Sequence, residues 1–307
     1  MTPNIGELAA LLTAMCYATS SIFFTVAGQR FGPLIANRLR LIVAILLVSI
    51  AHWIIIGSPI PLGSTAQQWF WLGTSGIIGL ALGDLFLFQA YILIGPRLGL
   101  LFLSLSPALA TLLAWIFLGE KLSIGNILGI LITLAGIAWV VLEGNPNGKD
   151  RSKKGKEINH QDYVRGILAG LGAAIGQALG LILAKKGLVG DFPALSANVI
   201  RMASATLALW GVTIIQRQAI LTLQRAKLQP SSMLYIVAGA FFGPLIGVSL
   251  SLFAIQKTNV GIASTIIALP PVFLLPIGYF LFKERFGWGA VAGTLVTIAG
   301  VALLFLF

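Results

Sequence analysis

The chain has 307 residues, of which 58% are hydrophobic and only 9% charged, and its mean hydropathy is +0.97. A soluble globular domain carries roughly 25% charged residues, so this composition excludes that class and indicates an integral membrane protein. The formal net charge of +11 does not indicate nucleic acid, because the basic residues lie in short loops between apolar runs, as in other membrane proteins. We therefore expect a lipid bilayer, and no nucleic acid, as the chain's environment.

Ten apolar runs follow one another along the chain, each close to the roughly 20 residues that a helix needs to cross the hydrocarbon core. Backbone polar groups must be satisfied inside the bilayer, so runs of this length predict helices. We predict an all-α integral membrane protein with ten transmembrane helices. The predicted spans are about 6–28, 34–56, 69–94, 98–118, 124–142, 164–187, 194–215, 232–255, 261–282 and 287–307.

A single long polar segment, residues 143–163, interrupts this series. Its Gly, Asn, Pro and Lys residues are typical of a flexible, solvated linker. It separates five predicted spans from five more. We predict a first five-helix repeat at 5–143, a polar linker at 144–163 and a second five-helix repeat at 164–307.

The two halves are related in sequence. A shift of 164 residues, without a gap, aligns helix-breaking residues and one loop acid of the first half with identical residues of the second. A slightly smaller shift aligns Asn37 and Arg40 with Asn198 and Arg201. The pairs at the larger shift include Gly79 with Gly243, Gly83 with Gly247, Pro107 with Pro271, Glu120 with Glu284, Gly129 with Gly293, Thr133 with Thr297 and Gly136 with Gly300. This pattern indicates an internal duplication.

An odd number of spans in each repeat has a geometric consequence. The second repeat must enter the membrane from the opposite side, so the repeats are predicted to be inverted about a pseudo-two-fold axis in the membrane plane. Secondary transporters use this arrangement, with the substrate site near the midplane between the repeats. The excess of Lys and Arg on one side predicts that the linker is cytoplasmic and that both termini face out.

Two copies of one pattern carry a family resemblance. Residues 98–142 contain SLSPALATLLAWIFLGEKLSIGNILGILITLAGIAWVVL, with a Pro in the fourth predicted helix, a Gly-Glu pair that closes it, and a Gly-spaced fifth helix. Residues 261–304 repeat the pattern, with Lys283 where the first copy has Gly119. The chain resembles EamA-type members of the drug/metabolite transporter superfamily along nearly its whole length. The resemblance implies secondary transport of a small solute, which in this superfamily ranges from amino acids and sugars to nucleotide sugars and drugs.

Asp84 is the acid that lies within a predicted span rather than at its margin. An ionisable group there costs roughly 2.5–3.5 kcal/mol on insertion scales, so we expect it to face the bundle interior and to have a partner. Two interpretations remain open: a proton-coupling or cation-binding carboxylate, or an acid locked to a partner such as Arg40. Its counterpart in the second repeat is Val248.

Arg40 and Arg201 lie just inside the second and seventh spans, each three residues after an asparagine, Asn37 or Asn198. An arginine in a cavity binds a carboxylate or phosphate through two hydrogen bonds, whereas an arginine near a helix end also extends to the interface. Both readings stay open for this pair. For Arg38, on the opposite face, we expect extension to the interface.

Further polar side chains are candidates for a cavity lining. Tyr17 and its counterpart Gln177 lie in the first span of each repeat, and Gln89 follows Asp84. Hydrogen bonding between helices explains such residues equally well. Trp115 is a candidate either for stacking on a substrate or for anchoring a helix end. Glu120 is expected to cap or tie adjacent helix ends.

These observations favour a secondary transporter, an exporter or exchanger of a small polar or amphipathic metabolite such as an amino acid, in the cell membrane. A passive channel is the alternative. The chain has no Walker motif, no clustered nucleophile and base, and a single cysteine, Cys16, so we expect neither catalysis nor a cofactor or metal. We expect a monomer or homodimer.

Overall fold

The computed structural model describes residues 4–143, 160–275 and 287–306. In these residues it contains nine helical segments long and apolar enough to cross a membrane, and a shorter apolar one, Val260–Leu275. Together they form the predicted all-α membrane fold of two inverted five-helix repeats. Most of the predicted linker, Pro276, and the second-copy residues Lys283 and Glu284 lie outside the described residues.

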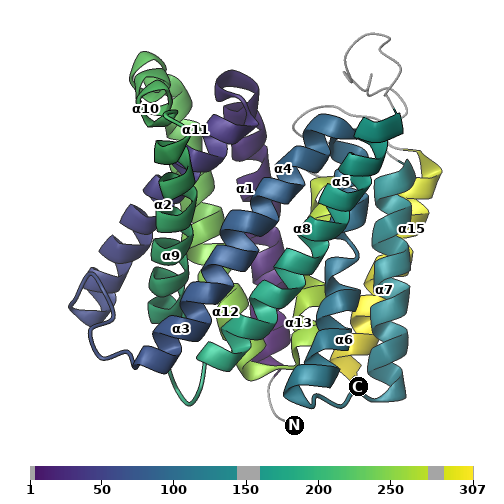
Figure 1. The fold of residues 1–307 in the computed structure, drawn as a ribbon. Helices are drawn as coiled ribbons and strands as arrows, with labels where there is room; N and C mark the ends of the chain where they lie inside the picture. The colour runs from purple at the N-terminus through teal and green to yellow at the C-terminus, as the bar shows by residue number, and fades with distance from the viewer. Residues whose placement is uncertain (1–3, 144–159, 276–286, 307) are drawn as a thin grey trace.

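The helices of the first repeat are interleaved with those of the second (Figure 1). Its third span is one continuous rod in which a π-helical turn, η1, separates two α-helices. Its fourth span is divided in two. The elements are α1 (Ile5–Phe31), α2 (Pro33–Ile56), α3 (Ala66–Ser75), η1 (Gly76–Leu82), α4 (Gly83–Leu93), α5 (Gly95–Leu103), α6 (Ser106–Leu118) and α7 (Ile124–Glu143).

The second repeat follows the same order, with one addition. A short helix, α10, stands between its second and third spans, where the sequence predicted only a loop. The elements are α8 (His160–Gly187), α9 (Ala194–Ile215), α10 (Ala219–Leu228), α11 (Pro230–Ala240), η2 (Phe241–Gly247), α12 (Val248–Lys257), α13 (Val260–Ile267) and α15 (Trp288–Leu306). The two chain termini lie at one end of the bundle and α10 at the other (Figure 1).

The departures from regular α-helix occur at equivalent positions of the two repeats. The third spans carry η1 and η2, and the fourth spans break at Ser104–Leu105 and at Ala268–Leu269. The first break lies just before Ser106 and Pro107, and the second just before Pro270 and Pro271. Proline breaks a helix because it donates no backbone hydrogen bond and clashes with the preceding turn. Pro107 and Pro271 therefore account for the two breaks. Within η2, Pro244 has the same effect.

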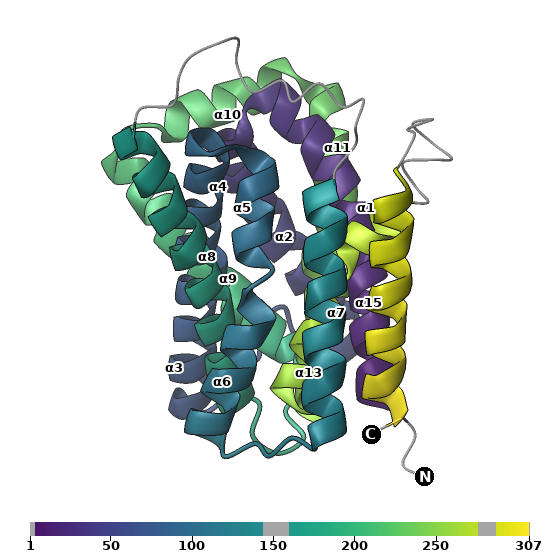
Figure 2. The ribbon, with the colours of Figure 1, turned by 90° about the vertical axis from the view of Figure 1, so that its right-hand side faces the viewer.

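The fifth helices of the two repeats, α7 and α15, pack side by side at one edge of the bundle (Figure 2). A Cβ added at Gly136 would lie 2.3 Å from Oγ1 of Thr297, and one added at Gly300 would lie 2.4 Å from Oγ1 of Thr133. Gly136 is the counterpart of Gly300, and Thr133 is the counterpart of Thr297, so the two contacts are equivalent under the symmetry that relates the repeats. The interface is thus two-fold symmetric, and small residues let the helices approach.

The first helix of each repeat packs on the third span of the other. A Cβ at Gly243 would lie 2.4 Å from Oγ of Ser20, so α1 rests directly on η2. On the opposite side, a Cβ at Gly180 would lie 2.9 Å from Cα of Gly79, so α8 rests on η1. The glycines thus let the helices of the two repeats approach closely at both places.

We predict that Gly136→Ala destabilises the protein by about 1–3 kcal/mol, because its new methyl group would overlap the backbone and hydroxyl of Thr297. Gly211→Ala in α9 is the matched control, because no atom lies within 4 Å of a Cβ there and alanine favours the helix. Thermal unfolding of the purified protein in detergent, followed by tryptophan fluorescence, measures both. Equal unfolding temperatures for the two variants would contradict the proposed interface.

Candidate functional site

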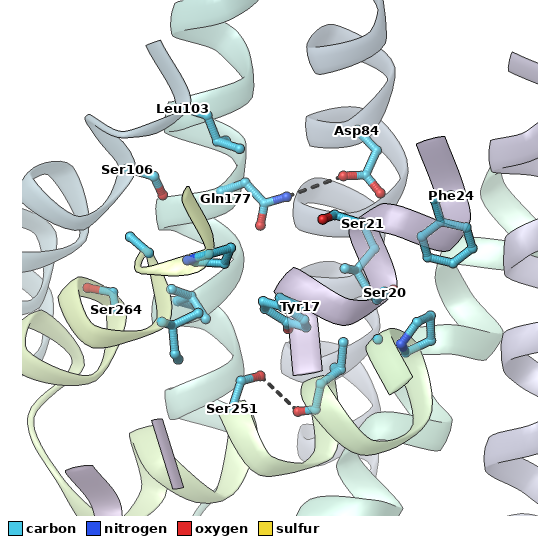
Figure 3. Close-up of a pocket in the computed structure, with 18 of the residues that line it drawn as sticks. Tyr17, Ser20, Ser21, Phe24, Asp84, Leu103, Ser106, Gln177, Ser251 and Ser264 are labelled. Carbon is cyan, nitrogen blue, oxygen red and sulfur yellow. Dashed lines mark hydrogen bonds between the residues drawn. The ribbon is translucent and has the colours of Figure 1, made fainter. Parts of the chain in front are cut away.

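A cavity of about 390 Å³ lies between the two repeats and takes its walls from both. Figure 3 shows Tyr17 of α1, Gln177 of α8 and Ser251 of α12 around it, with Asp84 of α4 beside Gln177. Most of the lining is aliphatic or aromatic. The polar side chains among the lining residues are Tyr17, Ser20, Ser21, Arg40, Asp84, Ser104, Ser106, Gln177, Arg201, Ser251 and Ser264.

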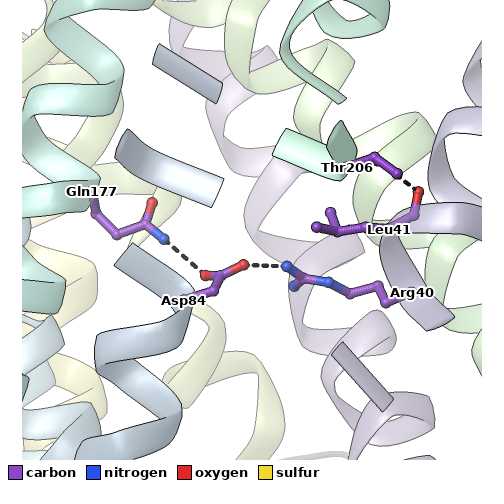
Figure 4. Close-up of polar contacts among 5 residues, drawn as sticks. All are labelled: Arg40, Leu41, Asp84, Gln177 and Thr206. Carbon is purple, nitrogen blue, oxygen red and sulfur yellow. Dashed lines mark hydrogen bonds and ion pairs between the residues drawn. The ribbon is translucent and has the colours of Figure 1, made fainter. Parts of the chain in front are cut away.

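Asp84 is held by two partners from different helices. It lies in the first turn of α4, is 6% exposed, and forms an ion pair with Arg40 of α2. Nε2 of Gln177 on α8 donates a hydrogen bond of 3.3 Å to its other oxygen, which completes the chain of contacts in Figure 4. A Cβ at Gly83 would lie 3.6 Å from the backbone nitrogen of Gln177, so this glycine brings α8 within reach. Asp84 thus has the interior position and the partner expected from its cost.

The partner arginine also has an aromatic contact. The guanidinium carbon of Arg40 lies 5.7 Å from the ring centroid of Phe24, a cavity residue on α1. A cation above an aromatic face is attracted by the ring quadrupole. Arg40 is therefore positioned from two sides, by Asp84 and by Phe24.

Arg201, the counterpart of Arg40, has a different environment. It lines the cavity and is 3% exposed. Its Nε has no hydrogen-bond partner, and no ion pair to it is formed by the residues that the structure describes. A Cβ at Gly76 would lie 2.2 Å from its carbonyl oxygen, so α9 packs directly on η1.

Three of the eight candidate site residues lie away from the cavity lining. Asn198 is fully buried and donates from Nδ2 to the carbonyl oxygen of Pro244 (2.8 Å) and to Oγ of Ser249 (2.9 Å). It therefore ties α9 to the π-helical turn. Asn37 is buried with no hydrogen-bond partner for either side-chain atom, and Gln89 is exposed on α4. The cavity brings together Tyr17, Arg40, Asp84, Gln177 and Arg201.

Four further hydroxyl groups line the cavity and were not among the residues predicted from the sequence. Ser104 and Ser106 flank the break between α5 and α6, and Ser264 lies on α13 just before the equivalent break. Ser251 lies on α12, and its Oγ donates to the carbonyl oxygen of Val248 (2.8 Å). Proximity to Pro107 and Pro271 was the available signal, since a broken helix exposes its ends to a cavity.

Two other residues lie where the structure gives them a clear role. Arg38 is buried rather than extended to the interface: it donates to Oγ1 of Thr222 on α10 (3.4 Å) and to Gln216 (3.5 Å). The expectation for Arg38 was wrong because α10, which was not predicted, covers it. Trp115 is 63% exposed on α6 and does not line the cavity.

Polar contacts join the repeats at the end of the bundle that carries the termini. Both carboxylate oxygens of Glu120 accept from the backbone N–H of Val260, at 2.8 and 3.1 Å, and cap α13. This confirms the predicted capping role. Within the second repeat, Nζ of Lys185 donates to the carbonyl oxygens of Ile255 and Thr258 and ties α8 to the end of α12. Burial raises the pKa of the Glu120 carboxyl above its ordinary value, although Lys185 and the backbone N–H groups oppose the shift.

Inverted repeats, broken fourth spans and a central cavity with an ion pair define the class of helical membrane transporters. The EamA-like transporter family matches the chain twice, over residues 4–142 and 164–306. The chain therefore belongs to the EamA-like transporter family of the drug/metabolite transporter superfamily, as its sequence pattern indicated.

The fold has a counterpart among solved structures. One of them, described only as the crystal structure of a protein, superposes with a TM-score of 0.73 at 18% sequence identity. The match covers 98% of this chain and 96% of the other. At this identity the likeness concerns the fold alone. No curated protein sequence matches the chain at a significant level.

We predict that the Arg40–Asp84 pair couples strongly in stability. Arg40→Leu leaves a buried carboxylate with Gln177 as its remaining described partner, which should cost about 3–5 kcal/mol. The double variant Arg40→Leu/Asp84→Leu should lose less than the sum of the single variants. Thermal unfolding of all four proteins gives the coupling free energy. Additive losses would mean that the pair contributes nothing as a pair.

Proposed function

We propose that the protein is a secondary transporter, an exporter or exchanger, that moves a small polar or amphipathic metabolite by alternating access. Membership of the EamA-like family establishes a transporter family, and the proposal adds the mechanism and the kind of solute. The observation that carries it is the cavity of about 390 Å³ whose walls come from both inverted repeats. That volume suits a small metabolite.

The symmetry of the irregular segments supports alternating access. The π-helical turns and the breaks of the fourth spans occupy equivalent positions in the two repeats, and both breaks adjoin the cavity through Ser104 and Ala268. Two inverted repeats around one site give two related conformations, each open to one side. Helix breaks of this kind let the ends of a span move relative to one another.

The polar contacts at the terminal end support a closed gate there. Glu120 of the first repeat accepts hydrogen bonds from the backbone N–H of Val260 in the second, and a Cβ at Gly261 would lie 2.7 Å from Oγ1 of Thr111, so α13 packs closely on α6. In the proposed cycle these contacts separate when the terminal end opens. We further propose a cell-membrane location with the linker on the cytoplasmic side, as the basic residues suggest.

We predict saturable counterflow in proteoliposomes. A thermal-shift screen of the purified protein against carboxylates, amino acids, sugars, nucleotides and cationic drugs selects the solute. Vesicles preloaded with that solute should then accumulate its labelled form transiently, because a carrier returns loaded from either side. Protein-free vesicles are the control. Ohmic currents without saturation would instead indicate a channel.

We predict that Asp84 couples solute flux to protons. In wild-type proteoliposomes an imposed pH gradient should drive uptake, and Asp84→Asn should abolish that dependence while leaving exchange at equal pH. The physical reason is that a carboxyl group in the cavity wall can carry a proton across the transport cycle, whereas an amide cannot. Unchanged coupling in Asp84→Asn would restrict the acid to a structural role.

A further inference from the structure

Arg201 is a buried charge in the cavity wall that forms no ion pair with a described residue. It is 3% exposed, and its Nε lacks a hydrogen-bond partner. An arginine cannot be neutralised by losing its proton in a protein. A charge in such a place is costly unless an anion pairs with it. The side chain of Arg201 therefore lines a space that a ligand can enter, and no ion pair with a described residue balances its charge.

The inverted repeat explains why this partner is missing. Arg40 and Arg201 are counterparts, and both line the cavity. Asp84 neutralises Arg40, whereas the counterpart of Asp84 is Val248, which lines the cavity as an aliphatic side chain. The duplication thus supplies two guanidinium groups and one carboxylate. A second carboxylate equivalent to Asp84 would stand at position 248, where the chain has an uncharged valine instead.

The charge balance sets the charge of the occupant. Among the described lining residues the formal charges are those of Arg40, Arg201 and Asp84, so the cavity carries one net positive charge. One anionic group on the ligand balances it, and a dianion or a cation does not. Neighbouring hydroxyls of Tyr17 and Ser251 add neutral hydrogen-bonding capacity.

The remaining wall sets the body of the occupant. Leu80, Ile137, Val141 and Ile267 make much of the lining aliphatic, and Phe24 adds an aromatic ring. Such walls stabilise an apolar group by excluding water from it. A sugar phosphate or nucleotide, with many hydroxyls and more charge, would leave polar groups unpaired against these residues.

We infer that Arg201 is the anion-binding residue of the cavity and that the transported solute is a monocarboxylate with an apolar body. The inference rests on the proposed function and deepens it. The solute carboxylate occupies the position beside Val248 that a second acid would hold, and pairs with Arg201 as Asp84 pairs with Arg40. Glycines 76 and 79 of η1 hold the arginine in place, since a Cβ at Gly79 would lie 3.6 Å from its Nη2.

The test uses probes that share one body and differ in charge. They are 3-phenylpropionate, phenylsuccinate, L-phenylalanine, 3-phenylpropylamine and 3-phenylpropanamide. Their affinities for the full-length protein in nanodiscs are measured by isothermal titration calorimetry. We expect 3-phenylpropionate to bind most tightly, and Arg201→Gln to weaken it by about 10- to 100-fold, the range of a charged hydrogen bond. Binding of 3-phenylpropanamide should change less than threefold.

Two further variants separate a ligand site from a structural role. Val248→Asp supplies the missing acid, so it should weaken 3-phenylpropionate about tenfold more than Val248→Asn does, and should raise the unfolding temperature of the ligand-free protein. Arg38→Gln removes a buried arginine that contacts α10 instead of the cavity, and should leave the affinity unchanged.

Several results would overturn the inference. They are equal affinity for the propionate and the amide, no effect of Arg201→Gln, or no binding of any probe. Oleate is also a monocarboxylate with an apolar body, but it comes from the membrane. Tighter binding of oleate than of 3-phenylpropionate would refute the inference that the ligand is a small solute. Binding is measured at equilibrium and does not depend on transport. Carboxylate binding without counterflow would therefore refute the proposed transport mechanism alone. Counterflow of an uncharged solute would refute the proposed anion site alone.

Discussion

The hydrocarbon core offers no hydrogen bonds and no counter-ions, and the described structure depends on meeting that constraint from within the protein. Hydroxyls and amides donate to carbonyl groups of neighbouring helices: Ser20 to Gly239 (2.8 Å) and Asn198 to Pro244. These acceptors lie in or beside the third span of the second repeat, where glycine and proline loosen the helical ladder. The polar side chains thus tie the irregular segments to their neighbours, and the cavity forms among them.

The duplication makes the exceptions informative. Close glycine contacts between the repeats exist in two copies, such as Gly136 with Thr297 and Gly300 with Thr133. Asp84 exists once, so the two arginines of the cavity have unequal surroundings. Arg40 is held by a carboxylate and an aromatic ring, while Arg201 has neither. This inequality, rather than the cavity's size, is the basis for the proposed binding of a monocarboxylate.

Motion and rigidity are divided between different elements. The glycine contacts of α7 with α15, of α1 with η2 and of α8 with η1 are close backbone approaches, which do not deform gradually. The breaks before Pro107 and Pro271 lie beside the cavity, in spans with fewer internal hydrogen bonds. A transport cycle built on this fold would move the half-spans while the glycine interfaces stay packed.

The sequence by itself determined the membrane class, the duplication, the family and the interior position of Asp84, because each depends on composition or spacing along the chain. The tertiary structure decided which polar residues share the cavity. Spacing places Asn198 and Arg201 on one helix but does not say that Asn198 meets η2 while Arg201 meets the cavity. It also did not predict that α10 covers Arg38, or that the cavity hydroxyls gather at the helix breaks. The contact partners of these side chains lie on helices far apart in the chain. The spacing of residues along one helix shows which of them share a face, but not which other helix that face meets.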